Sequence, residues 1–301
     1  MAVAGLRQIR RRIKTVQSTR KITRAMELIS ASRIGRAQTR ANAAKPYSEK
    51  ITEVIRNVAG SVGGDVRHPL LEERPLANYG IVVVTSDGGL AGAYNSNVLR
   101  IAERKLRQVR EETAEQKAFV VGRKGLSFLR FRRYDVARNF LGISDRPTYA
   151  DAEGLAQAVM EAYIAGEVDR VDMVYTEFIS IGTQRPTLTQ VLPVPVAEVS
   201  GAGPDAEQSS AKASYIFEPS AEEILGRLLP SYVASRLYTA LLEAAASEHA
   251  SRRRAMKAAT DNAQDIITLL TRVANQARQA EITTEINEIV GGAEALSESR
   301  E

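Results

Sequence analysis

A regular spacing of apolar residues near the start of the chain most constrains what it can fold into. Apolar side chains alternate separations of three and four positions, which is the seam of a coiled coil: Leu6, Ile9, Ile13 and Val16. Farther along, the same register again meets apolar and small residues: Ile34, Ala37, Ala41, Ala44, Ser48, Ile51, Ile55 and Val58. We therefore expect one long N-terminal coiled-coil helix over residues 1–60.

Between these two stretches the seam turns polar. The register there falls on four polar residues, Arg20, Thr23, Glu27 and Ser30. Apolar residues lie next to them instead, at Ile22, Met26 and Ile29. Because one residue is about 100° around a helix, the apolar stripe leaves the seam here. Either the partner helix wraps around to follow the stripe, or this face meets something else.

The end of the chain carries a second long helical pattern, over residues 215–296. We expect Pro46 to kink or interrupt the first helix and Pro230 to break or bend the second, because proline lacks the N–H that a helix needs. Residues 231–290 alone would span roughly 90 Å, far more than an ordinary domain. A seam is predicted at Ile266, Leu270, Val273, Ala277 and Ala280, and a rotated apolar face at Ile282, Ile286, Ile289, Ala293 and Leu296. The two helices are expected to pair antiparallel as a shaft or spacer.

The residues between the two helices have an α/β pattern. Short apolar and β-branched runs predict strands at 80–85, 118–122, 171–179 and 187–192, and helices are predicted at 95–110, 124–131 and 151–165. This alternation favours a Rossmann-like α/β domain with a mostly parallel sheet over residues 75–200. Residues 201–214, rich in Gly, Ser and Ala, are expected to form a flexible loop. The predicted fold class is mixed: a long antiparallel coiled coil plus an inserted α/β domain.

The chain is poorly equipped for catalysis or metal binding. It has no Cys and only two His, which excludes a disulfide scaffold, a thiolate metal site, a Cys nucleophile and a three-histidine zinc site. The turn at residues 86–92 lies where a Rossmann protein binds phosphate, but its glycines do not fit G-x-G-x-x-G, so a tight structural turn is favoured. Asp87 has no evident base or metal partner, and His249 is expected to be exposed rather than catalytic. We predict no independent enzymatic activity and no cofactor.

Charge is divided unevenly along the chain. The formal net charge is +5, yet residues 1–45 carry twelve Lys and Arg against Glu27 alone, a net +11 that leaves −6 for the rest. Such a basic arm is typical of a nucleic-acid contact or of a helix face that meets an acidic protein. No aromatic residue precedes Tyr47, which disfavours single-stranded nucleic acid but leaves a basic coiled-coil duplex binder as the alternative function. No apolar run approaches the roughly 18 residues of a membrane span, so we expect a soluble protein of a reducing compartment, for which docking on a membrane complex stays open.

Blocks along nearly the whole chain resemble one known family, the gamma subunit of F-type ATP synthase. Residues 9–28, IRRRIKTVQSTRKITRAMEL, are similar to the opening of that subunit. The turn TSDGGLAGAYN at 85–95 resembles the family's T-S-D-R-G-L-C-G-x-x-N, with Gly88 in place of Arg and Ala91 in place of Cys. Residues 248–263 and the run QAEITTEINEIVGGA at 279–293 are similar to two further family blocks.

The resemblance implies a central rotor stalk inside a hexamer of three alpha and three beta subunits, with ATP made or hydrolysed on beta. It also implies contacts with the epsilon subunit and with the c-ring of the membrane sector, at the cytoplasmic face of the plasma membrane, and none with nucleic acid. By the same resemblance, contacts with the beta subunits are expected at Lys21, Arg24, Met26, Arg252, Gln279, Thr283 and Glu285. The apolar face at 282–296 would turn in a hydrophobic bearing at the top of the hexamer.

Overall fold

The computed structural model describes residues 2–61, 68–112, 115–195 and 221–298. The loop predicted at 201–214 lies outside these ranges. The chain divides into two compact units. The coiled-coil unit combines the residues up to Ile29 with those from Arg253 onward, and the α/β unit comprises Ser30–Arg252. Within the described ranges, no helix is both long enough and apolar enough to cross a membrane.

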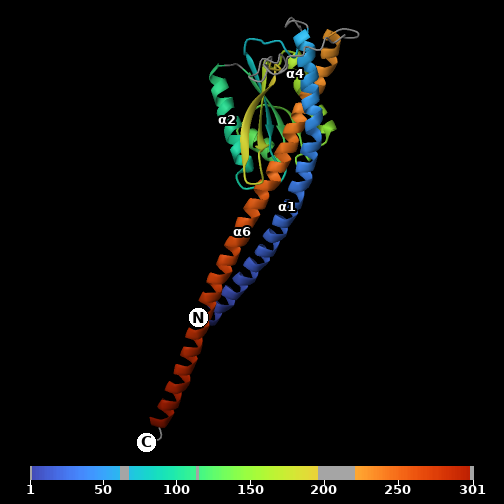
Figure 1. The fold of residues 1–301 in the computed structure, drawn as a ribbon. Coiled ribbons are helices and arrows are strands. Elements are labelled where there is room, and N and C mark those ends of the chain that lie inside the picture. Colours follow the sequence, from blue (N-terminus) through green and yellow to red (C-terminus); the bar gives the residue numbers. More distant parts are fainter. Residues whose placement is uncertain (1, 62–67, 113–114, 196–220, 299–301) are drawn as a thin grey trace. The chain divides into compact units, whose positions relative to one another are not determined.

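The described chain begins and ends with a long helix. Helix α1 spans Ala2–Ser61 and helix α6 spans Ala221–Glu298 (Figure 1). Neither proline ends its helix, because α1 continues through Pro46 and α6 through Pro230. Pro46 is exposed, so water can bind the carbonyl group that loses its helical partner. Packing along the opposite side of α1 offsets the remaining free-energy cost of the proline.

In the coiled-coil unit the two helices run antiparallel. The hydroxyl oxygens of Thr23 and Thr260 lie 2.8 Å apart, and the Arg20 guanidinium donates to Gln264 Oε1. Residue numbers therefore increase along one helix in the direction in which they decrease along the other. On α1 every predicted seam position from Leu6 to Glu27 is buried or half-buried. On α6 the buried or half-buried seam is Met256, Thr260, Ala263, Ile267, Leu270, Ala274, Ala277 and Glu281.

The seam predicted on α6 is therefore only partly right. Leu270 and Ala277 do lie on the seam, but Ile266 and Val273 are 44% and 38% exposed, and Ala280 is exposed too. The apolar residues of this segment outnumber the positions that one partner helix can cover. Periodicity alone could not tell which of two overlapping apolar stripes meets α1, because both repeat every three or four residues.

The α/β unit is built on a five-stranded sheet of order β3-β2-β1-β4-β5. Its strands are β1 (Asn78–Val84), β2 (Glu115–Val121), β3 (Val136–Phe140), β4 (Arg170–Phe178) and β5 (Gln184–Leu192). The strands are parallel except β5, which pairs antiparallel with β4. The prediction missed β3 because this edge strand, with the sequence VARNF, is exposed at its three central residues and has no apolar run.

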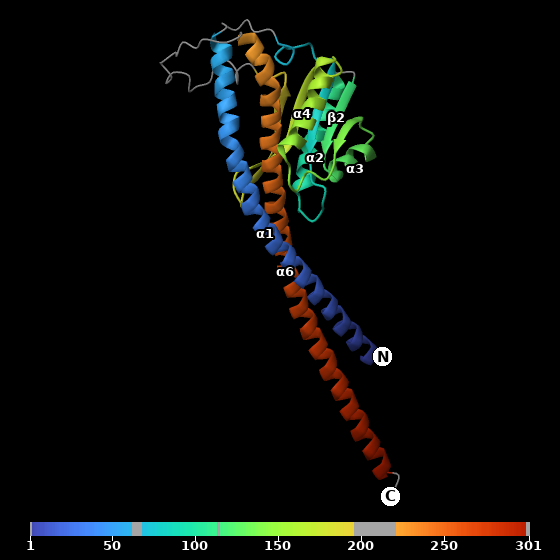
Figure 2. The ribbon, with the colours of Figure 1, turned by 90° about the vertical axis from the view of Figure 1, so that its right-hand side faces the viewer.

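Helices cover both faces of this sheet (Figure 2). Helices α2 (Tyr94–Glu112) and α3 (Arg123–Phe131) share one apolar core with alternate residues of β1, including Ile81 and Val83. Helix α4 (Tyr149–Ile164) packs on the other face, where Val82 and Val84 share a second core with parts of α1 and α6. Burial of β1 on both faces explains its continuous β-branched run, from which the sequence predicted it.

Candidate functional site

The polar residues on the seam of α1 are buried against α6 rather than avoided by it. Thr23 and Glu27 are 8% and 7% exposed, and Arg20 is half-buried. Their polar groups find partners: Arg20 at Gln264, Thr23 at Thr260, and Glu27 at Arg24 at 2.8 Å. Because each polar group is satisfied, the partner helix can keep its register across the polar stretch. It does not wrap around to follow the apolar stripe.

The displaced apolar stripe consequently faces outward. Ile22, Leu28 and Ile29 are 61%, 56% and 53% exposed, whereas Met26 is half-buried. Of the two alternatives that the sequence left open, the coiled-coil unit agrees with the second, a face available to something other than α6. Exposed apolar side chains next to exposed Lys21 and Arg24 are typical of a protein-interaction surface.

The C-terminal part of α6 has no partner helix in the described chain. The pairing of Thr23 with Thr260 places Ala2, the first residue of α1, opposite Glu281. Every residue from Ile282 to Gly291 is exposed, including four large apolar side chains: Ile282, Ile286, Ile289 and Val290. An apolar face of this size on a single helix is usually covered by a partner.

The six predicted contact residues of the coiled-coil unit do not lie in one site. Lys21 and Arg24 are exposed on α1, while Gln279, Thr283 and Glu285 are exposed on α6. The antiparallel pairing puts these two groups about 20 residues apart along the coiled coil, which is roughly 30 Å. Met26 is half-buried beside the first group. Arg252 belongs to the α/β unit.

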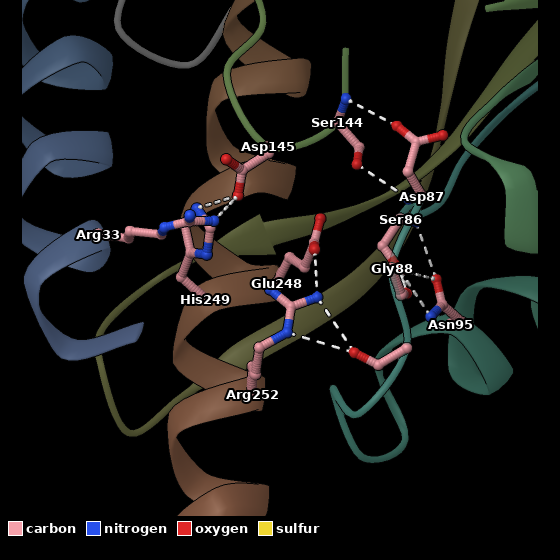
Figure 3. A network of polar contacts seen from close by, with 11 residues as sticks. Arg33, Ser86, Asp87, Gly88, Asn95, Ser144, Asp145, Glu248, His249 and Arg252 are labelled. Atoms are coloured by element: carbon pink, nitrogen blue, oxygen red, sulfur yellow. Dashed lines mark hydrogen bonds and ion pairs between the residues drawn. The ribbon is translucent and has the colours of Figure 1, made fainter. Parts of the chain in front are cut away.

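Arg252 is committed to contacts within the α/β unit. Its side chain is only 12% exposed, its Nη2 donates to Glu248 Oε1, and both Nε and Nη2 donate to the Gly89 carbonyl at 3.3 Å (Figure 3). Burial raises the pKa of Glu248, and the charge of Arg252 opposes that rise. Arg252 thus ties α6 to the turn after β1. The i, i+4 spacing of Glu248 and Arg252 is a signal from which the ion pair could have been predicted.

The same turn is held by a carboxylate. Asp87 accepts hydrogen bonds from the backbone N–H groups of Arg123 (3.1 Å), Gly142 (2.9 Å) and Ser144 (3.4 Å). Its own N–H donates to Ser144 Oγ at 2.9 Å (Figure 3). In a Rossmann phosphate site, backbone N–H groups of this kind would face the ligand. Here an internal carboxylate uses them, which supports the structural-turn interpretation of residues 86–92.

Gly122 lets the neighbouring strand approach this turn. It follows β2 with φ +87°, and a Cβ on it would lie 2.3 Å from the Thr85 carbonyl oxygen. Thr85 in turn donates from Oγ1 to the Val121 carbonyl at 2.8 Å and accepts from the Gly125 N–H at 2.8 Å. The backbones are therefore packed too closely for any side chain at position 122.

His249 is buried, so the prediction that it is exposed is wrong. It is 2% exposed, and its Nε2 lies 3.5 Å from Asp145 Oδ1, which also binds Arg33 Nη1 at 2.5 Å (Figure 3). Burial lowers the pKa of His249 to about 4, Asp145 opposes this shift, and Arg252 and Arg33 add to it. The ring is therefore neutral at pH 7. Its polar neighbours Ser247 and Glu248 suggested exposure, but they too are buried.

Together these side chains join four parts of the α/β unit. We call Arg33, Asp145, His249, Glu248 and Arg252 the polar clamp, since they connect α1, the segment before α4, α6 and the turn after β1. The clamp offers a dense set of ion pairs rather than a nucleophile with a base. Among the described residues, no group of three or more His, Cys, Asp or Glu is arranged to hold a metal ion.

Known proteins are similar to this sequence along nearly its whole length. The ATP synthase family model matches residues 5–296. A protein named ATP synthase gamma chain from Frankia casuarinae is 51% identical over 297 residues, which cover 97% of this chain and 98% of that protein. The protein of the same name from Thermobifida fusca is 50% identical over 299 residues, covering 98% and 97%. The chain belongs to the ATP synthase gamma chain family.

Solved structures agree with the fold. A chain of the Euglena gracilis mitochondrial ATP synthase, from a structure of OSCP, F1 and c-ring, has a TM-score of 0.68 at 17% identity, covering 99% of this chain and 96% of that one. A chain from the Tetrahymena thermophila ATP synthase central stalk and c-ring has a TM-score of 0.58 at 24% identity, covering 79% and 99%. The gamma-chain likeness confirms the predicted fold class, with long terminal helices and a central, mostly parallel sheet.

Proposed function

We propose that this chain is the central rotor stalk of an F-type ATP synthase. In this role it couples ion flow through the membrane sector to ATP synthesis or hydrolysis on the beta subunits. The observation that carries the proposal is the full-length similarity, at about half of all positions, to proteins named ATP synthase gamma chain. Its partners are then the alpha and beta subunits of the hexamer, the epsilon subunit and the c-ring, at the cytoplasmic face of the plasma membrane.

The coiled-coil unit supports a mechanical role. Its two exposed apolar surfaces, one near Ile22 and one from Ile282 onward, lie at different levels and on different helices. A stalk with such an uneven surface presents different contacts to each of three surrounding beta subunits as it turns. Lys21, Arg24, Gln279, Thr283 and Glu285 are exposed and available for those contacts. Charges of this kind steer and orient a partner more than they hold it.

The two remaining predicted contacts, Met26 and Arg252, are less accessible than the other five. Met26 is half-buried between the seam and the exposed strip, where its side chain reaches a partner only at its edge. Arg252 stays a predicted contact, but its guanidinium already binds Glu248 and Gly89. We propose that Arg252 acts chiefly inside the stalk, by fixing α6 to the sheet.

The polar groups of the α/β unit support a non-catalytic stalk. Asp87, Glu248 and Asp145 are engaged with backbone N–H groups or guanidinium groups of the same chain. The nucleic-acid alternative is less well supported. Several arginines of the basic arm are spent within the chain, such as Arg20 on Gln264 and Arg24 on Glu27, and the family is not one of nucleic-acid binders.

Reconstitution tests the proposal. Alpha, beta and epsilon subunits of the same complex are assembled with and without this chain on membrane vesicles that contain the membrane sector. ATP-driven ion pumping should require this chain. A chain that ends after Glu281, and so lacks the unpartnered part of α6, should still assemble but should couple less well. Equal pumping in the absence of the chain would refute the proposal.

A further inference from the structure

One exposed aromatic ring on the α/β unit lies outside all the roles described so far. Phe131 is the last residue of α3 and is 82% exposed, more than any other large apolar side chain of the described residues. Arg130, Arg132 and Arg133 flank it in sequence, and all three are exposed. We call residues 130–133, Arg-Phe-Arg-Arg, the basic knuckle.

The backbone of the basic knuckle holds an arginine where glycine is usual. Arg133 has φ +61°, and its N–H donates to the Arg130 carbonyl at 3.0 Å. The next N–H, of Tyr134, donates to the Leu129 carbonyl at 3.0 Å. These bonds end α3 in a left-handed turn, where a Cβ is strained and glycine is favoured. Arg133 thus places a side chain where glycine would be more stable, which indicates that the side chain has a function.

The basic knuckle continues a field of positive charge on α2. Glu103 pairs with Arg132 at 3.3 Å and with Arg107 at 2.8 Å, so the end of α3 lies against the middle of α2. A shallow groove beside them is lined by Arg100, Glu103, Arg104 and Arg107. The groove and the knuckle together contribute six guanidinium groups and the carboxylate of Glu103, and exposed Asp135 follows two residues after Arg133. Helices α2 and α3 cover the same face of the sheet (Figure 2).

We propose that the basic knuckle and the arginines of α2 bind the anionic headgroups of a lipid bilayer. The Phe131 ring enters the boundary between headgroups and acyl chains, while the guanidinium groups stay with the phosphates. A protruding ring needs no matching pocket in a bilayer, whereas an acidic protein would have to supply one. Each basic group near an anionic bilayer adds modestly to affinity, so the contact is weak and reversible. This goes beyond the rotor function and holds or fails independently of it.

A fluorescent label on the ring position tests the proposal directly. The chain has no Cys, so Phe131→Cys can be labelled with an environment-sensitive dye without other changes. Ile181→Cys, 46% exposed between β4 and β5 at the opposite edge of the sheet, is the control. The probes are vesicles of phosphatidylcholine, with or without phosphatidylglycerol. We expect a blue shift, and quenching by lipids spin-labelled in the acyl chain, only for the label at 131 and only with phosphatidylglycerol.

A second variant separates binding from folding. Arg133→Gly relieves the left-handed strain, so the thermal unfolding midpoint should rise by about 2–4 °C. Affinity for phosphatidylglycerol vesicles should nevertheless fall about fivefold, because one cation near the surface is lost. Arg227→Gln removes the same charge from a side chain that is 79% exposed elsewhere in the α/β unit, and it should change affinity less than twofold.

Several results would overturn the proposal. These are a label at 131 that does not respond to phosphatidylglycerol vesicles, equal responses at 131 and 181, and equal losses for Arg133→Gly and Arg227→Gln. A response at 131 to the alpha–beta complex or to duplex DNA, with none to vesicles, would also overturn it and would assign the surface to protein or nucleic acid.

Discussion

Polar side chains in the α/β unit hold several partners each, whereas those on the seam of the coiled-coil unit hold one or two. Asp87 accepts three backbone N–H groups, and Arg252 binds both a carboxylate and a carbonyl. Thr23 and Thr260, in contrast, meet across the seam, and each hydroxyl also lies within hydrogen-bond distance of a carbonyl of its own helix. The α/β unit is thus fixed by interdependent contacts, while the coiled-coil unit is held by small, separable ones.

This difference suits two parts of one mechanical element. The α/β unit binds α6 to the sheet through the polar clamp, so force applied there is shared among several strands and helices. The coiled-coil unit leaves its exposed surface to other proteins and relies on small contacts within the seam. The two units should therefore respond to substitution in these different ways.

The largest loss of stability is expected at Gly122. Gly122→Ala should lower the free energy of unfolding by about 3 kcal/mol or more, because the new methyl group would overlap the Thr85 carbonyl and strain a backbone that favours glycine. Gly142→Ala is a matched control, since φ is +82° but nothing lies within 4 Å of its Cβ; its loss should be about 1 kcal/mol. Urea unfolding measures both. Equal losses would show that close packing at the turn does not matter.

The second largest effect is expected at Arg252. Arg252→Ala leaves the Glu248 carboxylate buried without its cation, which should cost about 3 kcal/mol of unfolding free energy. Glu248→Gln in the same chain should recover part of that loss, because the uncompensated charge is gone. Lys257→Ala, an exposed position farther along α6, should change stability by less than about 0.5 kcal/mol. No recovery in the double variant would argue against the ion pair as the cause.

His249 makes the stability of the α/β unit depend on pH. Its folded pKa of about 4 lies below the ordinary histidine value of 6.5, so between these values the unfolded chain binds a proton that the folded chain does not. Stability is therefore lost as pH falls from 6.5 towards 4, by about 2 kcal/mol. Glu243, whose folded pKa is raised to about 7 by burial, has the opposite dependence. The comparison of wild type with His249→Gln isolates the histidine, and parallel pH profiles would contradict this account.

The smallest effect is expected on the coiled-coil seam. Thr23→Val and Thr260→Val should each change the unfolding free energy by no more than about 1 kcal/mol, because the other hydroxyl keeps a carbonyl of its own helix. In the double variant the two changes should add, with a coupling below about 0.5 kcal/mol. Coupling as large as that between Glu248 and Arg252 would remove the contrast between the two units.

The sequence predicted those features that repeat or that need a continuous run of one residue type. The seam on α1 was predicted to the residue, because a helix in contact with one partner buries every third or fourth side chain. The seam on α6 was misplaced, because two apolar stripes overlap there and only the partner selects between them. Strand β3 was missed because its exposed central residues form no apolar run. The buried His249 was missed because its burial is set by segments far away in sequence, such as Asp145 and Arg33.

The contact residues carried over by resemblance show the same limit. The sequence could name Arg252 as a basic group on α6, but it could not show that Gly89 and Glu248 already occupy its guanidinium. Position 88 lies directly beside this guanidinium, since a Cβ there would be 3.4 Å from Arg252 Nη2, an ordinary van der Waals contact.

The most direct test of the rotor proposal follows the rotation of this chain itself. Because the sequence has no Cys, Glu153→Cys on the exposed side of α4 provides a single point for attaching a bead, with the alpha–beta hexamer fixed to a surface. We predict that the bead turns in one direction while ATP is hydrolysed and stops when ATP is removed. ATP hydrolysis by the assembled complex with a bead that remains stationary would contradict the account.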